Sequence, residues 1–95
     1  METLQLIDNP DKSRFEAEIE GHLAVVEYIR QQDRIYLTHT EVPQALGGKG
    51  YGSKLIETVL EQIELEGLRL IALCPFVRAY LQRHPEWNRL LDPSN

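Results

Sequence analysis

A cluster of glycines marks the junction between two segments of different periodicity, and it constrains the fold more than any other feature. Four of the six glycines lie between residues 47 and 52, in the run Gly-Gly-Lys-Gly-Tyr-Gly. Residues 34–42 before the cluster have the pattern of a strand, and residues 53–66 after it have that of a helix. Glycine permits a tight bend there, and the first turn of a helix offers unpaired N–H groups and a positive dipole end. The junction therefore predicts a site for a phosphorylated cofactor, with a flexible glycine loop as the alternative.

The segments ahead of the glycines have the patterns of strands joined by tight turns. One of them alternates apolar and charged side chains, which is typical of a strand with one face in water. The next is apolar on both faces, which indicates a more central strand, and Gly21 between the two indicates a hairpin. A turn cluster over residues 8–11 follows a short edge strand at the N-terminus. In chain order, the predicted strands are 4–7, 14–20, 23–29 and 34–42.

Two helices and one further strand are predicted after the glycines. Apolar side chains recur at helical spacing through residues 53–66, with charged side chains opposite them, and Gly67 is placed to end this helix. Residues 68–74 read as a buried strand. Pro75 suits the first position of a second helix, which Pro85 stops.

This order of elements predicts how the sheet is arranged. Strand, glycine loop, helix and strand form a βαβ unit, so the strands around 35–42 and 69–74 should run parallel with a right-handed crossover. We therefore predict an α/β (α+β) fold: a mixed, mostly antiparallel sheet with a central parallel strand pair and two packed helices. Ligands in such sheets bind beyond the carboxyl ends of the strands. The glycine loop, His39 and Cys74 are predicted to meet at that end.

Length and composition indicate one ordinary domain. The 95 residues fit a single domain over 1–95, with residues 1–3 and 92–95 expected to be frayed. No apolar run approaches the roughly 20 residues that span a bilayer, and the single cysteine is compatible with a reducing compartment. A net charge of −5 argues against nucleic-acid binding and mildly favours cationic partners such as amines. We expect a cytoplasmic monomer or homodimer with no nucleic-acid or membrane partner.

The glycine cluster resembles a known cofactor loop. It is not a Walker A loop, because Gly52-Ser53-Lys54 has the wrong residue order, and the preceding strand does not open an alternating series as in dinucleotide-binding folds. It resembles the pyrophosphate loop of the GNAT superfamily of N-acetyltransferases, Gln/Arg-x-x-Gly-x-Gly/Ala, in which Gly50 and Gly52 match the two glycines. Gly47 stands where that loop usually has Gln or Arg. In element order the resemblance covers about residues 13–84 and is closest to a short, stand-alone branch.

The resemblance implies an acetyl-CoA-dependent N-acetyltransferase that moves an acetyl group to an amine of a small molecule or protein. Coenzyme A would lie between the parallel strands, with its pyrophosphate on the amides of residues 48–52. We assign no metal ligands. The implied cofactor-binding residues are Thr40, Glu41, Val42, Gly47, Gly48, Lys49, Gly50, Tyr51, Gly52 and Ser53.

An alternative function follows from the same comparison. No helix pair separates the first two predicted strands, and little chain follows Pro85. These segments normally wall the acceptor site in the superfamily. The alternative is therefore a non-catalytic module that binds acyl-CoA or another protein.

A base is needed for amine acetylation, because the attacking nitrogen must be neutral. His39 lies at the ligand end of its strand, and by alternation it shares a face with Ile35 and Leu37. An imidazole accepts a proton near neutral pH, so His39 is our candidate general base, with Glu41 as an alternative. The main-chain N–H of Val42 is placed to polarise the thioester carbonyl.

Two further residues are candidates for the thiol side of the reaction. Cys74 directly precedes a helix that opens at Pro75, where the dipole can stabilise a thiolate, so it is either an acyl carrier or thiolate partner, or a small buried hydrophobe. The resemblance implies that Tyr80 protonates the departing thiolate. Phe76 and Tyr80 are four residues apart, which also fits two core positions on one helix face.

Overall fold

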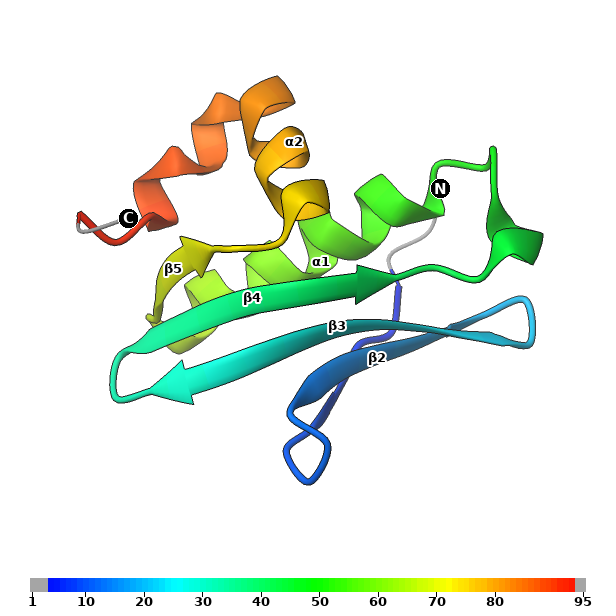
Figure 1. Ribbon diagram of the computed structural model, residues 1–95, viewed down its shortest axis with the longest axis horizontal. Coiled ribbons are helices and arrows are strands. Elements are labelled where there is room, and N and C mark those ends of the chain that lie inside the picture. The colour runs from blue at the N-terminus through cyan, green and yellow to red at the C-terminus, as the bar shows by residue number, and fades with distance from the viewer. Residues whose placement is uncertain (1–3, 94–95) are drawn as a thin grey trace.

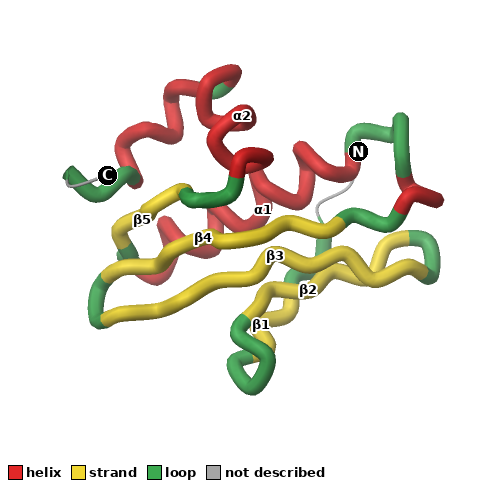
Figure 2. The backbone as a smooth tube through the Cα atoms, in the orientation of Figure 1, coloured by secondary structure: helices red, strands yellow, loops and turns green. Residues whose placement is uncertain are grey.

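The protein consists of a five-stranded mixed sheet and two α-helices (Figures 1 and 2). Both helices pack on the same face of the sheet and form one hydrophobic core with it. The computed structural model describes residues 4–93. The strands are β1 (Ile7–Asn9), β2 (Arg14–Ile19), β3 (His22–Gln31), β4 (Arg34–Glu41) and β5 (Arg69–Ala72). The helices are α1 (Tyr51–Glu66) and α2 (Pro75–Arg83), with short 3₁₀ segments η1 (Gln44–Leu46) and η2 (Pro85–Leu90).

The sheet order β1-β2-β3-β4-β5 follows the chain. The first four strands are antiparallel neighbours, whereas β4 and β5 run parallel, paired from Arg34↔Arg69 to Leu37↔Ala72. The central position of β3, the parallel pair and the mostly antiparallel character of the sheet confirm the predicted fold class. Helix α1 begins at Tyr51, two residues before the predicted start, and Gly67 ends it in the left-handed conformation (φ 70°).

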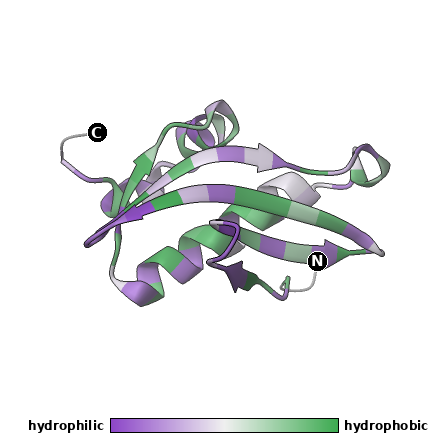
Figure 3. Ribbon diagram, turned by 60° about the horizontal axis from the view of Figure 1, so that its bottom comes forward, coloured by the Kyte–Doolittle hydropathy of each residue, from purple (hydrophilic) through white to green (hydrophobic). Residues whose placement is uncertain are grey.

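The core lies between α1, α2 and the face of the sheet that carries Phe15, Val26 and Leu37. Helix α1 is amphipathic, so hydrophobic and hydrophilic stretches alternate along it in Figure 3. Both α1 and α2 lie over this one face of the sheet, and neither lies over the opposite face (Figure 1). On that open face Ile29 and Leu73 are about half exposed.

The N-terminal edge strand lies later in the chain than predicted. β1 spans Ile7–Asn9, so Asp8 and Asn9, which we expected in a turn, pair with β2. Side-chain contacts explain why polar residues occupy this strand: Asn9 Nδ2 donates to Glu16 Oε2 at 3.1 Å, and Tyr28 OH donates to Asp8. A turn-forming composition was overridden by tertiary hydrogen bonds.

Asp92, in the segment that we expected to be frayed, makes contacts beside β5. The Asp92 N–H donates to the carbonyl oxygen of Leu70 at 2.8 Å, and its buried carboxylate lies 3.1 Å from the Arg34 guanidinium. The segment around Leu91 and Asp92 thus pairs with β5 through Leu70. A long-range contact of this kind leaves no local pattern in the sequence. Residues 1–3 and 94–95, also expected to be frayed, lie outside the described residues.

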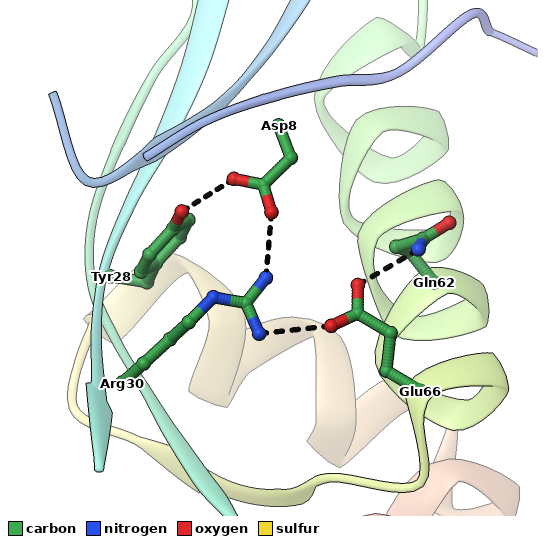
Figure 4. A network of polar contacts seen from close by, with 5 residues as sticks. All are labelled: Asp8, Tyr28, Arg30, Gln62 and Glu66. Atoms are coloured by element: carbon green, nitrogen blue, oxygen red, sulfur yellow. Dashed lines mark hydrogen bonds and ion pairs between the residues drawn. The ribbon is translucent and has the colours of Figure 1, made fainter. Parts of the chain in front are cut away.

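A polar network ties β1, β3 and the last turn of α1 together (Figure 4). The guanidinium of Arg30 donates to Asp8 Oδ2 at 2.7 Å and to Glu66 Oε1 at 2.9 Å. Gln62 donates to the other oxygen of Glu66 at 2.8 Å. The network holds the end of α1 that lies opposite to the glycine loop against the sheet.

Candidate active site

The parallel strands β4 and β5 separate after four paired residues. The N–H groups of Leu73 and Cys74 both donate to the carbonyl oxygen of Leu37, at 3.0 and 2.9 Å. Beyond that point β4 continues to Glu41, whereas β5 has ended and Cys74 already caps α2. The carboxyl ends of the two strands therefore diverge beside the glycine loop, as the βαβ pattern predicted.

The glycine loop delivers the start of α1 with free backbone donors. Gly48 and Gly50 have φ of 75° and 78°, and Gly50 is the N-cap of the helix. The first intrahelical bond runs from Lys54 N–H to the Gly50 carbonyl at 3.2 Å. The N–H groups of residues 51–53 therefore have no intrahelical acceptor, and the first turn contains no acidic side chain. This arrangement suits an anionic ligand.

A cleft of about 350 Å³ lies at this loop. Its walls are residues 42–44, 46–48 and 50–53 together with Phe76 from α2. Most of the predicted cofactor-binding residues line it. Thr40, Glu41 and Lys49 do not.

Phe76 belongs to the cleft wall, although its helical spacing predicted a core position. Its side chain is 42% exposed and lies directly over Gly52. A Cβ at position 52 would stand 2.7 Å from Phe76 Cζ, so a glycine is what allows the ring to lie there. The missed signal is the position of Phe76 just inside the helix that opens at Pro75, next to the predicted site.

A β-bulge at Thr38 changes the phase of β4. Tyr28 pairs with Leu37 and Glu27 pairs with His39, so Thr38 is an extra residue, and its Oγ1 donates to the Glu27 carbonyl at 3.2 Å. Alternation is interrupted there, and the side chains beyond the bulge exchange faces.

His39 consequently does not share a face with Ile35 and Leu37, and that prediction was wrong. Its side chain is 55% exposed, and its Nε2 lies 3.6 Å from Glu41 Oε2. Its cross-strand partner is Glu27, whose register places it on the open face. His39 and Glu41 therefore lie together at the open face, beside the end of the cleft.

Thr40 and Cys74 meet on the core side of the separated strands. Thr40 Oγ1 lies 3.4 Å from Cys74 Sγ, a weak hydrogen bond in which either atom can donate. The Cys74 side chain is 4% exposed and belongs to the hydrophobic core. His39 and Cys74 thus converge at the same end of the sheet, as predicted, but from opposite faces.

Tyr80 does not line the cleft of the glycine loop itself, but it lines an adjoining cavity. It is buried, its ring stacks on His84 with 4.3 Å between the ring centroids, and it lines a cavity of about 280 Å³ that shares Gly50 and Ser53 with the cleft. Burial and the nearby Glu57 carboxylate raise the pKa of Tyr80. The structure brings its side chain to the first turns of α1.

The β2–β3 hairpin supplies a residue that sequence reasoning did not single out. Glu20, at the tip of the hairpin, accepts from Lys49 Nζ at 2.8 Å and from Tyr51 OH at 2.9 Å. Its partners lie about 30 residues away in the chain, and a charged residue in a turn gives no local signal of such contacts.

Residues 4–93 contain neither a cluster of metal ligands nor a helix suited to a membrane. No three or more His, Cys, Asp or Glu side chains gather there in a group able to hold a metal ion. None of the helices described is long and apolar enough to cross a membrane.

A mixed sheet that splits beside a glycine-rich helix start defines an acetyltransferase fold, and the comparisons agree. Residues 14–90 match the GCN5-related N-acetyl-transferase family. The solution structure of a "GCN5-like putative N-acetyltransferase" from Staphylococcus aureus is similar, with 26% identity and a TM-score of 0.70 over 97% of this chain and 91% of that one. No curated protein sequence matches. The chain belongs to the GCN5-related N-acetyltransferase family, and its family and fold identify it as an acetyltransferase.

Proposed function

We propose that the protein is an acetyl-CoA-dependent N-acetyltransferase that acts on an amine of a small molecule or protein. The observation that carries the proposal is the free amide group of residues 51–53 beside the separation of β4 and β5. Hydrogen bonds to a charged group contribute about 1.5–3 kcal/mol each. Repulsion by the net charge of −5 is screened over about 8 Å at physiological salt, so the local amides dominate.

The cofactor supplies an acetyl group activated as a thioester. Residues 48–53 would hold its diphosphate, and Val42 and Phe76 would contact the arm that leads toward the separated strands. The cleft combines backbone donors of the glycine loop with apolar side chains such as Val42, Leu46 and Phe76, which suits a ligand with one charged part and one apolar part.

His39 is proposed as the general base at the open face. A lysine-like amine with a pKa of about 10.4 costs about 4.6 kcal/mol to deprotonate at pH 7, and a nearby imidazole lowers that cost. The protonated amine would lose one proton to His39 Nε2, and the neutral nitrogen would form a bond to the acetyl carbon while the carbon–sulfur bond breaks. The new amide nitrogen would release its second proton to water. Glu41, whose Oε2 lies 3.6 Å from His39 Nε2, would stabilise the imidazolium.

The placement of Cys74 favours direct transfer over an acyl-cysteine intermediate. Its thiol is buried on the core side and bonded to Thr40, whereas the acceptor would approach from the open face. We propose that Cys74 and Thr40 form the inner wall near the thioester sulfur, and that the departing thiolate takes up a proton from water.

The test combines binding and turnover. Calorimetry should detect coenzyme A binding, and release of free thiol should follow when acetyl-CoA and mixed amines are supplied. His39→Gln should reduce kcat about 10²-fold or more while leaving coenzyme A affinity unchanged. Cys74→Ala should keep a measurable part of the rate. Failure to bind coenzyme A at millimolar concentration would overturn the proposal. If Cys74→Ala lost all activity and an acetylated form of the wild-type enzyme could be trapped, Cys74 would instead be the acyl carrier.

The exposure of the open face is also compatible with the alternative function, a non-catalytic acyl-CoA-binding module. Because no helix covers His39 and Glu41 within the described residues, the acceptor side has few walls. A non-catalytic acyl-CoA-binding module would bind the cofactor without turnover, and sustained multiple turnover excludes it.

A further inference from the structure

The tip of the β2–β3 hairpin lies beside the glycine loop and is hydrogen-bonded to it (Figure 1). One oxygen of Glu20 bonds to Lys49 and the other to Tyr51, the two residues that flank Gly50. Glu20 has a left-handed backbone (φ 52°), uncommon for a residue with a side chain, and Gly21 follows at φ 79°. The turn therefore presents this carboxylate to the loop at some conformational cost.

The contact engages the cation of the loop and leaves its amides free. Glu20 bonds to side chains only, whereas the N–H groups of residues 51–53 stay without an intrahelical acceptor. The hydrogen bond to Lys49, then the one to Tyr51, lower the pKa of Glu20, so it is a carboxylate at neutral pH. The fold thus places its own anion beside the predicted diphosphate position.

We propose that Glu20 sets the affinity of the glycine loop for its ligand by competing for Lys49, which exchanges the carboxylate for a phosphate when the ligand binds. This inference rests on the proposed function, because it needs a diphosphate at the loop. It adds an affinity-determining residue, contributed by a hairpin outside the βαβ unit.

The exchange is physically accessible. The Lys49 and Glu20 side chains are 49% and 46% exposed, and exposed ion pairs contribute little to stability. Gly48 and Gly50 flank Lys49, so its backbone can adjust. A diphosphate carries more negative charge than one carboxylate. Glu20 therefore opposes the ligand by holding Lys49 and by its own charge.

The competition also predicts which ligands benefit. A ligand with phosphate groups can take Lys49 from Glu20, whereas an uncharged ligand such as pantetheine offers no replacement. Removing the Glu20 charge should strengthen binding of coenzyme A and leave pantetheine binding unchanged. A residue with a merely structural role would weaken both or neither when replaced.

Calorimetric titrations with coenzyme A and with pantetheine test the inference. Glu20→Gln should bind coenzyme A about two- to fivefold more tightly than the wild type, the range that loss of an exposed ion pair allows. Lys49→Met should bind it more weakly, and Glu20→Gln should gain less in the Lys49→Met background. Glu64→Gln is the matched control: it removes the same charge from another ion pair, with Arg89 near the far end of α1, and should leave affinity unchanged.

The outcomes separate the two proposals. If the wild type binds coenzyme A and Glu20→Gln binds it equally or more weakly, the competition is overturned and the proposed function stands. If the wild type does not bind coenzyme A, the proposed function fails first. Glu20→Asn, whose shorter side chain also tolerates the left-handed backbone, should show the same gain and guards against a folding defect peculiar to one variant.

Discussion

Gly50 and Gly52 are needed for different physical reasons, although both belong to the same motif. Gly50 takes a left-handed φ of 78° as the N-cap of α1, a conformation that costs a side-chain-bearing residue energy. Gly52 has a helical position, and the constraint on it comes from the Phe76 ring across the cleft. The first is a backbone requirement and the second is a packing requirement.

The two glycines should therefore respond differently to alanine. Gly50→Ala should lower the free energy of unfolding by about 1–2 kcal/mol, because a side-chain-bearing residue is strained in the left-handed conformation that the start of α1 requires. Gly52→Ala meets the far end of a half-exposed ring that can swing away, and alanine gains about 1 kcal/mol in helix propensity, so its stability should change by less than about 1 kcal/mol. Urea unfolding measures both. Equal destabilisation by the two substitutions would contradict this distinction.

The displaced ring gives Gly52→Ala a second, functional consequence. Phe76 should move within the cleft and reduce coenzyme A affinity, and Gly52→Ala/Phe76→Ala should recover part of it. Calorimetry on the single and double variants checks this. An affinity that falls further in the double variant would show that the ring itself supplies the binding.

At the scale of elements, the Arg30 network holds β1 and the end of α1 against β3. The guanidinium lies 4.9 Å from the Tyr28 ring centroid and bonds to two carboxylates from different elements. Arg89 offers a contrast, because its ion pair with Glu64 is about half exposed on both sides. The two arginines separate a partly buried network from a surface ion pair.

Arg30→Met should lower the free energy of unfolding by about 1.5–3 kcal/mol, since it removes two charged hydrogen bonds from a partly buried network. Arg89→Met should cost at most about 1 kcal/mol, as exposed pairs do. Chemical denaturation of both variants gives the comparison, and similar midpoints would show that the network adds nothing beyond a surface pair. Coenzyme A affinity serves as the control, because Arg30 lies at the opposite end of α1 from the cleft.

At the scale of the whole molecule, several ion pairs favour the ionised form of their carboxylates. Hydrogen bonds from Arg14, Lys49 and Arg89 lower the pKa values of the glutamates they contact. At Glu66 burial acts in the opposite direction, yet hydrogen bonds from Gln62 and Arg30 give a lowered pKa overall. The carboxyl groups concerned are Glu16, Glu20, Glu64 and Glu66.

Stability should therefore fall in acid. A carboxyl group with a lowered pKa binds fewer protons in the folded than in the unfolded state, so its contribution is complete above the ordinary value of 4.5 and is lost below it. Urea midpoints should stay level from pH 7 to about pH 5 and drop toward pH 3.5. The Glu64→Gln/Glu66→Gln variant should show a smaller drop. A midpoint that is constant down to pH 3.5 would contradict the assignment.

Local patterns predicted most of the fold because each element carried its own signal. Alternation predicted β2, helical spacing predicted α1, and Gly67 and Pro75 marked element ends that the structure contains. The parallel pair followed from element order alone. β1 was misplaced because hydrogen bonds from Tyr28 and Arg30 stabilise Asp8 in a strand, and such contacts are invisible to composition.

The sequence by itself determined the family, the fold and the glycine loop. Each of these depends on local patterns, because periodicity indicates the elements and the residues at a strand-to-helix junction set the backbone conformation there. The tertiary structure alone decided which side chains face the cleft. A single extra residue, Thr38, turns His39 to the open face, and folding brings Phe76 and Glu20 to the loop. Bulges and long-range contacts depend on how strands and hairpins pack together, so no local periodicity encodes them.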